Sequence, residues 1–66
     1  MKYSELVRRL RRLGIEKADE GARHEIWIRA ERQLRTVIPR HQSREIPPGT
    51  LARILRDLRL TLDDLR

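Results

Sequence analysis

Apolar residues recur every three or four positions near the start of the chain, a spacing typical of an amphipathic helix. The apolar face consists of Tyr3, Leu6, Val7, Leu10 and Leu13. Ser4 is placed to cap the first turn, and Gly14 supplies the left-handed residue with which helices commonly end. The pattern therefore predicts a helix over residues 4–13.

After the first helix the apolar positions alternate, as they do in strands. Residues 15–20 are a weak strand candidate, and residues 25–30 are a clearer one. A polar connection of hairpin length, residues 31–33, leads to a third strand over residues 34–39, which ends at a proline that cannot donate to a ladder. Three short strands joined by tight connections predict an antiparallel meander.

The middle strand has two different faces. Ile26 and Ile28 share one of them, while Trp27 and Arg29 take the other. Trp27 could pack under a helix, or it could offer its ring to an unpaired base, since stacking is worth about 1–3 kcal/mol per base. Packing is favoured, because the chain has one tryptophan and no phenylalanine, whereas aromatic RNA-binding platforms use several rings.

A second amphipathic helix follows the loop at residues 40–48. Thr50 can cap it. Its apolar face is Leu51, Ile54, Leu55 and Leu58. Near the end of the chain, Thr61 and Asp64 have the spacing of a capping box, which predicts one last helical turn.

These elements predict a single α+β domain over residues 1–66, in the order α-β-β-β-α. Two amphipathic helices can cover one face of a three-stranded antiparallel sheet and leave the other face open. This is the general plan of double-stranded-RNA-binding domains.

Charge points to a polyanionic partner. The 66 residues carry 16 Lys and Arg against 10 Asp and Glu, a net charge of +6, and most of the cations are arginine. Guanidinium groups bind phosphate in planar, bidentate fashion, so nucleic acid is the favoured partner and an acidic protein is the alternative. The chain has no cysteine, no signal-peptide pattern and no apolar run that could span a bilayer. We expect a soluble, cytoplasmic protein.

His24 is the candidate catalytic residue. Its imidazole can act as base or acid near neutral pH, and neighbouring Arg23 and Arg29 can stabilise charge on a phosphate. RNA brings its own nucleophile, the 2′-hydroxyl, so cleavage to a 2′,3′-cyclic phosphate needs no metal. A surface histidine in a small RNA-binding fold is the competing interpretation.

The other candidate groups carry weaker signals. His41 could share the proton transfers, although a structural or phosphate-binding role is favoured. The two histidines are seventeen positions apart without cysteine, which does not resemble a zinc site, and no glycine-rich phosphate loop is present. Glu25, Glu31 and Glu45 could bind Mg²⁺ weakly, but scattered carboxylates are more often surface charge. We expect no metal and no cofactor.

Three stretches of the chain resemble the HicA family of toxins from toxin–antitoxin pairs. They are the glycine turn and histidine at residues 21–27, the strand end at residues 37–41 and the Glu-Ile-Pro-Pro-Gly-Thr-Leu stretch at residues 45–51. The family typically has Gly-Ser-His or Gly-Gly-His, and this chain has the longer Gly21-Ala22-Arg23-His24. Arg59 stands where many relatives carry glycine.

The resemblance implies a double-stranded-RNA-binding-like fold and an mRNA interferase of a type II toxin–antitoxin system. Such toxins are ribosome-independent endoribonucleases that stop translation and growth until a HicB antitoxin holds them inactive. Their essential histidine corresponds to His24. The expected partners are therefore mRNA and a HicB-like antitoxin, with no membrane.

The residues expected to hold RNA are basic side chains of the strands and their connections. They are Arg23, Arg29, Arg32, Arg35, Arg40, His41 and Arg44. Two alternatives stay open: a non-catalytic RNA-binding module of the same fold, and an adaptor for an acidic protein.

Overall fold

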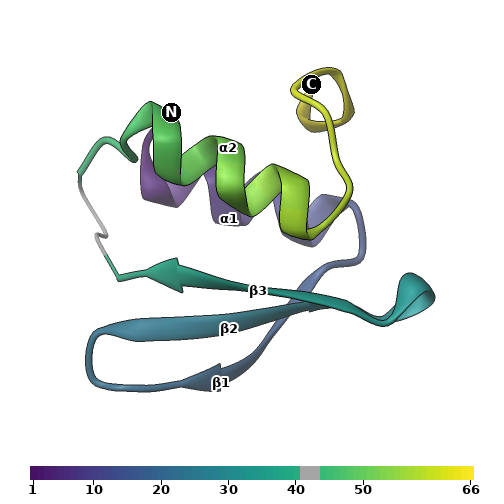
Figure 1. The fold of residues 1–66 in the computed structure, drawn as a ribbon, viewed down its shortest axis with the longest axis horizontal. Helices are drawn as coiled ribbons and strands as arrows, with labels where there is room; N and C mark the ends of the chain where they lie inside the picture. The colour runs from purple at the N-terminus through teal and green to yellow at the C-terminus, as the bar shows by residue number, and fades with distance from the viewer. Residues whose placement is uncertain (41–43) are drawn as a thin grey trace.

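A computed structural model describes residues 1–40 and 44–66 of the chain, and it has the predicted order of elements (Figure 1). The elements are α1 (Tyr3–Arg12), β1 (Glu16–Glu20), β2 (His24–Arg29), β3 (Leu34–Pro39) and α2 (Pro48–Asp57), with short 3₁₀ turns at Ala30–Arg32 and Asp63–Leu65.

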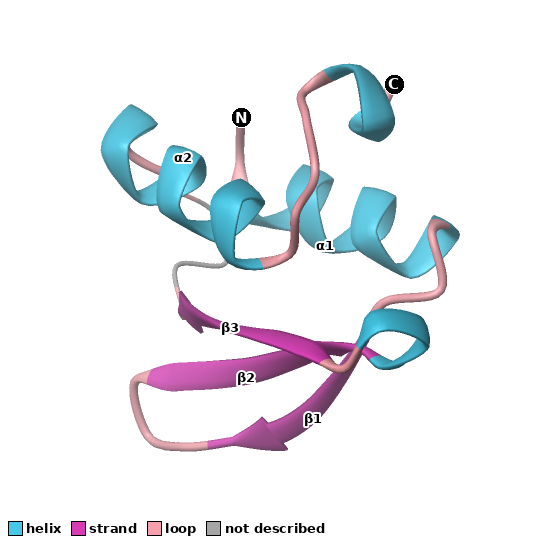
Figure 2. Ribbon diagram, turned by 45° about the vertical axis from the view of Figure 1, so that its right-hand side comes forward, coloured by secondary structure: helices cyan, strands magenta, loops and turns pink. Residues whose placement is uncertain are grey.

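The strands form one antiparallel sheet in the order β1-β2-β3. Both helices lie on the same side of this sheet, and the other side is uncovered (Figures 1 and 2). The predicted α+β architecture is therefore confirmed. Within the two described ranges, no helix has the length and apolar character needed to cross a membrane.

The alternation along β2 sorts its side chains as predicted. Trp27 is 1% exposed and belongs to the core beneath the helices, while Ile26 and Ile28 lie on the uncovered face and are half-buried. The guanidinium of Arg11 on α1 lies 5.3 Å from the centre of the indole ring. Trp27 is thus a packing residue, which confirms that interpretation over base stacking.

The rest of the core comes from the apolar faces of both helices and from the residues that flank the strands. The fully buried members, besides Trp27, are Leu6, Leu10, Ile15, Ile38, Ile54, Leu58 and Leu65. Leu13, assigned to the apolar face of the first helix, is instead 41% exposed, because α1 ends at Arg12 and Leu13 follows it as the C-cap.

The expected helix N-caps are wrong in both cases. Lys2 precedes α1, and the N–H of Tyr3 donates to the carbonyl of Arg44 at 3.1 Å, so the chain's own backbone takes the place of a Ser4 hydroxyl. Helix α2 begins at Pro48, which has no N–H to satisfy and a preset φ, so Thr50 lies inside the first turn.

The capping box at the end of the chain is confirmed. The N–H of Asp64 donates to the Thr61 hydroxyl at 3.3 Å, and the N–H of Thr61 donates to the Asp64 carboxylate at 2.8 Å. This backbone hydrogen bond from Thr61 is the main reason that the pKa of Asp64 is lowered. The turn buries Leu65 against the core.

The two helices end in the same hydrogen-bonding motif. In α1, Gly14 N–H donates to Arg11 O and Ile15 N–H donates to Leu10 O, both at 3.0 Å. This pair of bonds is the Schellman arrangement, which requires a left-handed residue, and Gly14 has a φ of 83°. The predicted glycine stop is confirmed.

In α2 the same two bonds run from Arg59 to Arg56 at 3.1 Å and from Leu60 to Leu55 at 2.8 Å. Here the left-handed position, with a φ of 54°, is occupied by Arg59. A side chain with a Cβ is strained in this region, which is the physical reason for glycine to be common at such a position.

We expect Arg59→Gly to raise the free energy of unfolding by about 1 kcal/mol, because glycine relieves the left-handed strain. For a domain of this size that corresponds to about 4–8 °C in Tm, measurable by thermal denaturation followed by circular dichroism. Arg56→Gly, the same change inside α2, should instead lower Tm. A lower Tm for Arg59→Gly would contradict the assignment of strain to this residue.

Candidate active site

His24 is the first residue of β2, and its side chain is exposed. Because its neighbour Glu25 faces the helices, strand alternation places the imidazole on the uncovered face of the sheet. Its partner across the ladder is Pro39, the last residue of β3. Among residues 1–40 and 44–66, no side chain forms a hydrogen bond or ion pair with the imidazole, which is therefore accessible to a substrate.

The turn before His24 is tied down by the backbone. Gly21 N–H donates to the carbonyl of His24 at 2.8 Å, and Arg40 N–H donates to the carbonyl of Arg23 at 3.0 Å. A Cβ at Gly21 would lie 3.3 Å from the His24 carbonyl oxygen, a close approach that suits glycine. The longer Gly21-Ala22-Arg23-His24 turn is accommodated because Ala22 and Arg23 are both exposed.

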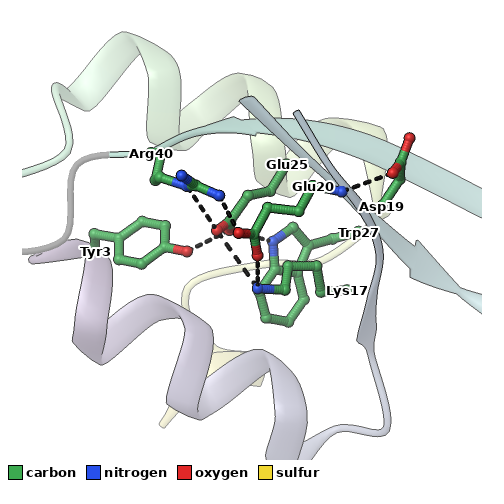
Figure 3. A network of polar contacts seen from close by, with 7 residues as sticks. All are labelled: Tyr3, Lys17, Asp19, Glu20, Glu25, Trp27 and Arg40. Atoms are coloured by element: carbon green, nitrogen blue, oxygen red, sulfur yellow. Dashed lines mark hydrogen bonds and ion pairs between the residues drawn. The ribbon is translucent and has the colours of Figure 1, made fainter. Parts of the chain in front are cut away.

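Directly behind His24, Glu25 lies in the core with 2% exposure (Figure 3). Its carboxylate accepts hydrogen bonds from the Tyr3 hydroxyl and, at 3.0 Å, from Trp27 Nε1. Lys17 Nζ and Arg40 Nε each lie 3.7 Å from its second oxygen. The expectation that Glu25 is surface charge is wrong. Its side chain is surrounded by four donors, which come from α1, from β1, from β2 and from the residue after β3.

The network shifts the pKa of two of its members. Burial, and then the hydrogen bond to Glu25, raise the pKa of Tyr3 far above its usual value. The hydrogen bond from Lys17, and then the charge of Arg40, lower the pKa of the exposed Glu20. The Arg40 guanidinium is bonded to the Glu20 carboxylate, so it points toward the helix side and away from the face that carries His24.

Arg29, expected to act on phosphate together with His24, lies at the other end of β2 and has a structural role. Arg29 Nη1 donates to the carbonyls of Leu58 at 2.7 Å and Arg59 at 3.2 Å, and its Nε donates to Glu31 at 2.9 Å. Arg29 therefore holds the C-terminal end of α2 against the sheet, and its guanidinium is engaged within the protein.

The remaining candidates for RNA contact are exposed but are not all in one place. Arg23 lies beside His24, and Arg44 follows the undescribed residues 41–43 near the start of α1. Arg35 pairs with Ile28 on the uncovered face, and Arg32 lies in the β2–β3 connection at the far end of the sheet. His41 lies outside the described residues.

The importance of Glu25 could have been inferred from the alternation alone. Glu25 and Trp27 are two positions apart, so they share a face of β2, and the assignment of Trp27 to the core carries Glu25 with it. Its partner Tyr3, 22 positions away, has no comparable signal in the sequence.

The comparison with protein families indicates the family to which the chain belongs. A family model described as the HicA toxin of bacterial toxin–antitoxin pairs matches residues 3–60, nearly the whole chain. The chain belongs to the HicA toxin family. Among curated proteins the comparison found no match.

The match to the HicA family covers all the elements that hold His24. The matched residues span both helices, the whole sheet and the Schellman motif that contains Arg59. This HicA protein thus has the role of a toxin in a toxin–antitoxin pair. In the described part of the chain, no three His, Cys, Asp or Glu side chains come together in a metal-binding cluster.

We expect Tyr3, the only tyrosine in the chain, to remain protonated in the folded protein well above pH 10, near which a free tyrosine ionises. Because its folded pKa is raised, the stability that it contributes is complete below about pH 10 and is lost as the pH rises above that value. The tyrosinate absorbance at 295 nm should therefore appear only as the protein unfolds.

Tyr3→Phe provides the control, because its stability should depend less steeply on pH in the alkaline range. A tyrosinate signal near pH 10 from protein that is still folded by circular dichroism would contradict the buried hydrogen bond.

Glu25→Gln should lower the free energy of unfolding by about 2 kcal/mol. Glutamine replaces one acceptor oxygen with a donor NH₂ group, so some of the buried donors around it would lose their acceptor. Glu16→Gln, on the exposed edge strand β1, is the matched control and should change stability much less. Urea denaturation measures both. Equal losses from the two variants would remove the basis for a central role of Glu25.

Proposed function

We propose that this HicA toxin is a metal-independent endoribonuclease, an mRNA interferase of the cytoplasm, and that His24 is its catalytic residue. The observation that carries the proposal is the placement of His24. It corresponds to the essential histidine that the HicA resemblance implies. Its side chain is exposed at the start of a strand whose other face is anchored by Glu25. Rigid support beneath an accessible imidazole suits proton transfer, which needs a well-placed group.

The reaction follows from the chemistry of RNA. The 2′-hydroxyl loses its proton and its oxygen attacks the adjacent phosphorus, the bond from phosphorus to the 5′-oxygen breaks, and the leaving oxygen gains a proton. The products are a 2′,3′-cyclic phosphate and a 5′-hydroxyl. His24 takes or gives one of these protons, a contribution of about 10²–10⁴-fold in rate. His41 stays a candidate for phosphate binding or for the second proton transfer.

Some of the arginines expected to hold RNA are bonded within the protein, so fewer of them can contact RNA directly. Arg23, Arg35 and Arg44 are exposed and can bind phosphate directly. Arg29 and Arg40 are bonded within the protein, so they add positive potential rather than direct contacts. Binding of this type is largely independent of RNA sequence and weakens as salt is raised. A HicB-like antitoxin would inhibit the toxin by covering His24.

The test is induction of the wild type and of His24→Ala in a bacterium without the antitoxin, followed by growth and mRNA integrity. We expect His24→Ala to lose cleavage by about 10²–10⁴-fold and to relieve the growth arrest. Leu62→Ala, an exposed apolar residue near the end of the chain, should remain toxic. Purified protein should leave 2′,3′-cyclic phosphate ends on RNA, whereas 3′-hydroxyl ends would rule out this mechanism.

The second candidate is a non-catalytic RNA-binding module, favoured by the net charge of +6 and the exposed arginines. Equal toxicity of the wild type and His24→Ala would exclude His24 as the catalytic group. RNA binding without cleavage by the wild type would support the binding module.

A further inference from the structure

At the end of the sheet remote from His24, a cavity of about 240 Å³ lies between the β2–β3 connection and the segment after α2. Its lining residues are Arg32, Leu34 and Arg59. Two cationic side chains from separate elements thus face one small concave space, and Leu34 provides an apolar wall.

The backbone at Arg59 is strained where it lines this cavity. Its φ of 54° is a conformation that glycine adopts without cost, and Arg29 holds it there by donating to the carbonyls of Leu58 and Arg59. Strain held in place by surrounding contacts is typical of functional positions. Contacts from β2 therefore fix the Arg59 backbone at the wall of the cavity.

Among the described residues, the cavity is lined by two cationic side chains and by no acidic one. The guanidiniums of Arg32 and Arg59 make no hydrogen bond or ion pair with residues 1–40 or 44–66. Glu31 accepts from Arg29 Nε, and Asp64 accepts from the Thr61 N–H while its charge also acts on Arg32. Two cations in one hollow repel each other unless an anion lies between them.

We propose that this cavity is a second phosphate-binding subsite for the RNA backbone, an inference that rests on the proposed nuclease function. A phosphate group can accept hydrogen bonds from both guanidiniums at different oxygens, and the larger negative charge of successive backbone phosphates is better matched to two cations than the single charge of a carboxylate. The net charge of the chain favours a polyanion over a single acidic side chain.

The subsite defines a path for the RNA. It lies near the end of β2, and His24 lies at the start of the same strand, so about five residue steps, roughly 17 Å, separate them along the strand. Arg35 shares the uncovered face with His24, whereas its neighbour Leu34 packs against the core on the helix side, so RNA that reaches both sites passes around the end of the sheet. The bound RNA therefore extends several nucleotides beyond the phosphate at which His24 acts.

The first test uses inorganic phosphate and the nuclear magnetic resonance signals of the arginine Nε–Hε groups. We expect phosphate to shift the signals of Arg32 and Arg59, and acetate at equal ionic strength to shift them less. Arg32→Gln or Arg59→Gly should abolish the effect. Equal responses to phosphate and acetate would show that the cavity does not select phosphate and would overturn the proposal.

The second test measures RNA affinity in the His24→Ala background, with short and long oligonucleotides. Arg32→Gln and Arg59→Gly should each weaken binding of the long RNA about tenfold and reduce the salt slope by about one, with little effect on the short one. Arg12→Gln, which removes one exposed charge from the end of α1, is the control and should have a smaller effect. Losses equal to that of Arg12→Gln would overturn the subsite.

Arg59→Gly separates function from folding, because it relieves strain and should raise Tm while it lowers RNA affinity. A loss of affinity in a more stable protein cannot result from unfolding. If the protein binds no RNA of any length while phosphate still shifts Arg32 and Arg59, the assignment to RNA is wrong. If His24→Ala stays toxic while the affinity losses occur, His24 is not the catalytic group and the RNA subsite stands.

Discussion

The buried carboxylate of Glu25 is the interaction on which the rest of the structure depends. A charge removed from water is costly unless other groups pair with it and satisfy its lone pairs. Tyr3 from α1, Lys17 from β1, Trp27 from β2 and Arg40 after β3 meet this requirement. One side chain thus joins the start of the first helix to all three strands, at the end of the sheet where the candidate active site lies.

Strand alternation couples this network to the site. Glu25 faces the helices, and its neighbour His24 therefore faces the uncovered side. The core contacts of Glu25 restrain the backbone that carries the imidazole, while the imidazole itself forms no hydrogen bond or ion pair with a described side chain. The hydrogen bonds of the turn, from Gly21 to His24 and from Arg40 to Arg23, add to that restraint. Support on one face and accessibility on the other are what a proton-transfer group requires.

The arginines divide into two groups that composition does not distinguish. Arg29 bonds to the end of α2, Arg53 bonds to the carbonyl of Val37 at 2.7 Å, and Arg40 completes the network at Glu25. These side chains replace some of the apolar contacts that a 66-residue chain is too short to supply. Others are exposed on the uncovered face, or line the cavity in which Arg59 lies. The net charge is therefore partly structural and partly available to a ligand.

The sequence by itself determined the order of the elements, the two faces of β2, the glycine stop of α1 and the position of His24. Each of these follows from a local period or a short motif, because neighbours along the chain specify the face on which a residue falls. Only the tertiary structure decided which groups surround Glu25, that Arg29 and Arg40 are engaged, and that backbone contacts replace the expected caps. These outcomes depend on pairs far apart in the chain, such as Tyr3 with Glu25, 22 positions away, which no local pattern encodes.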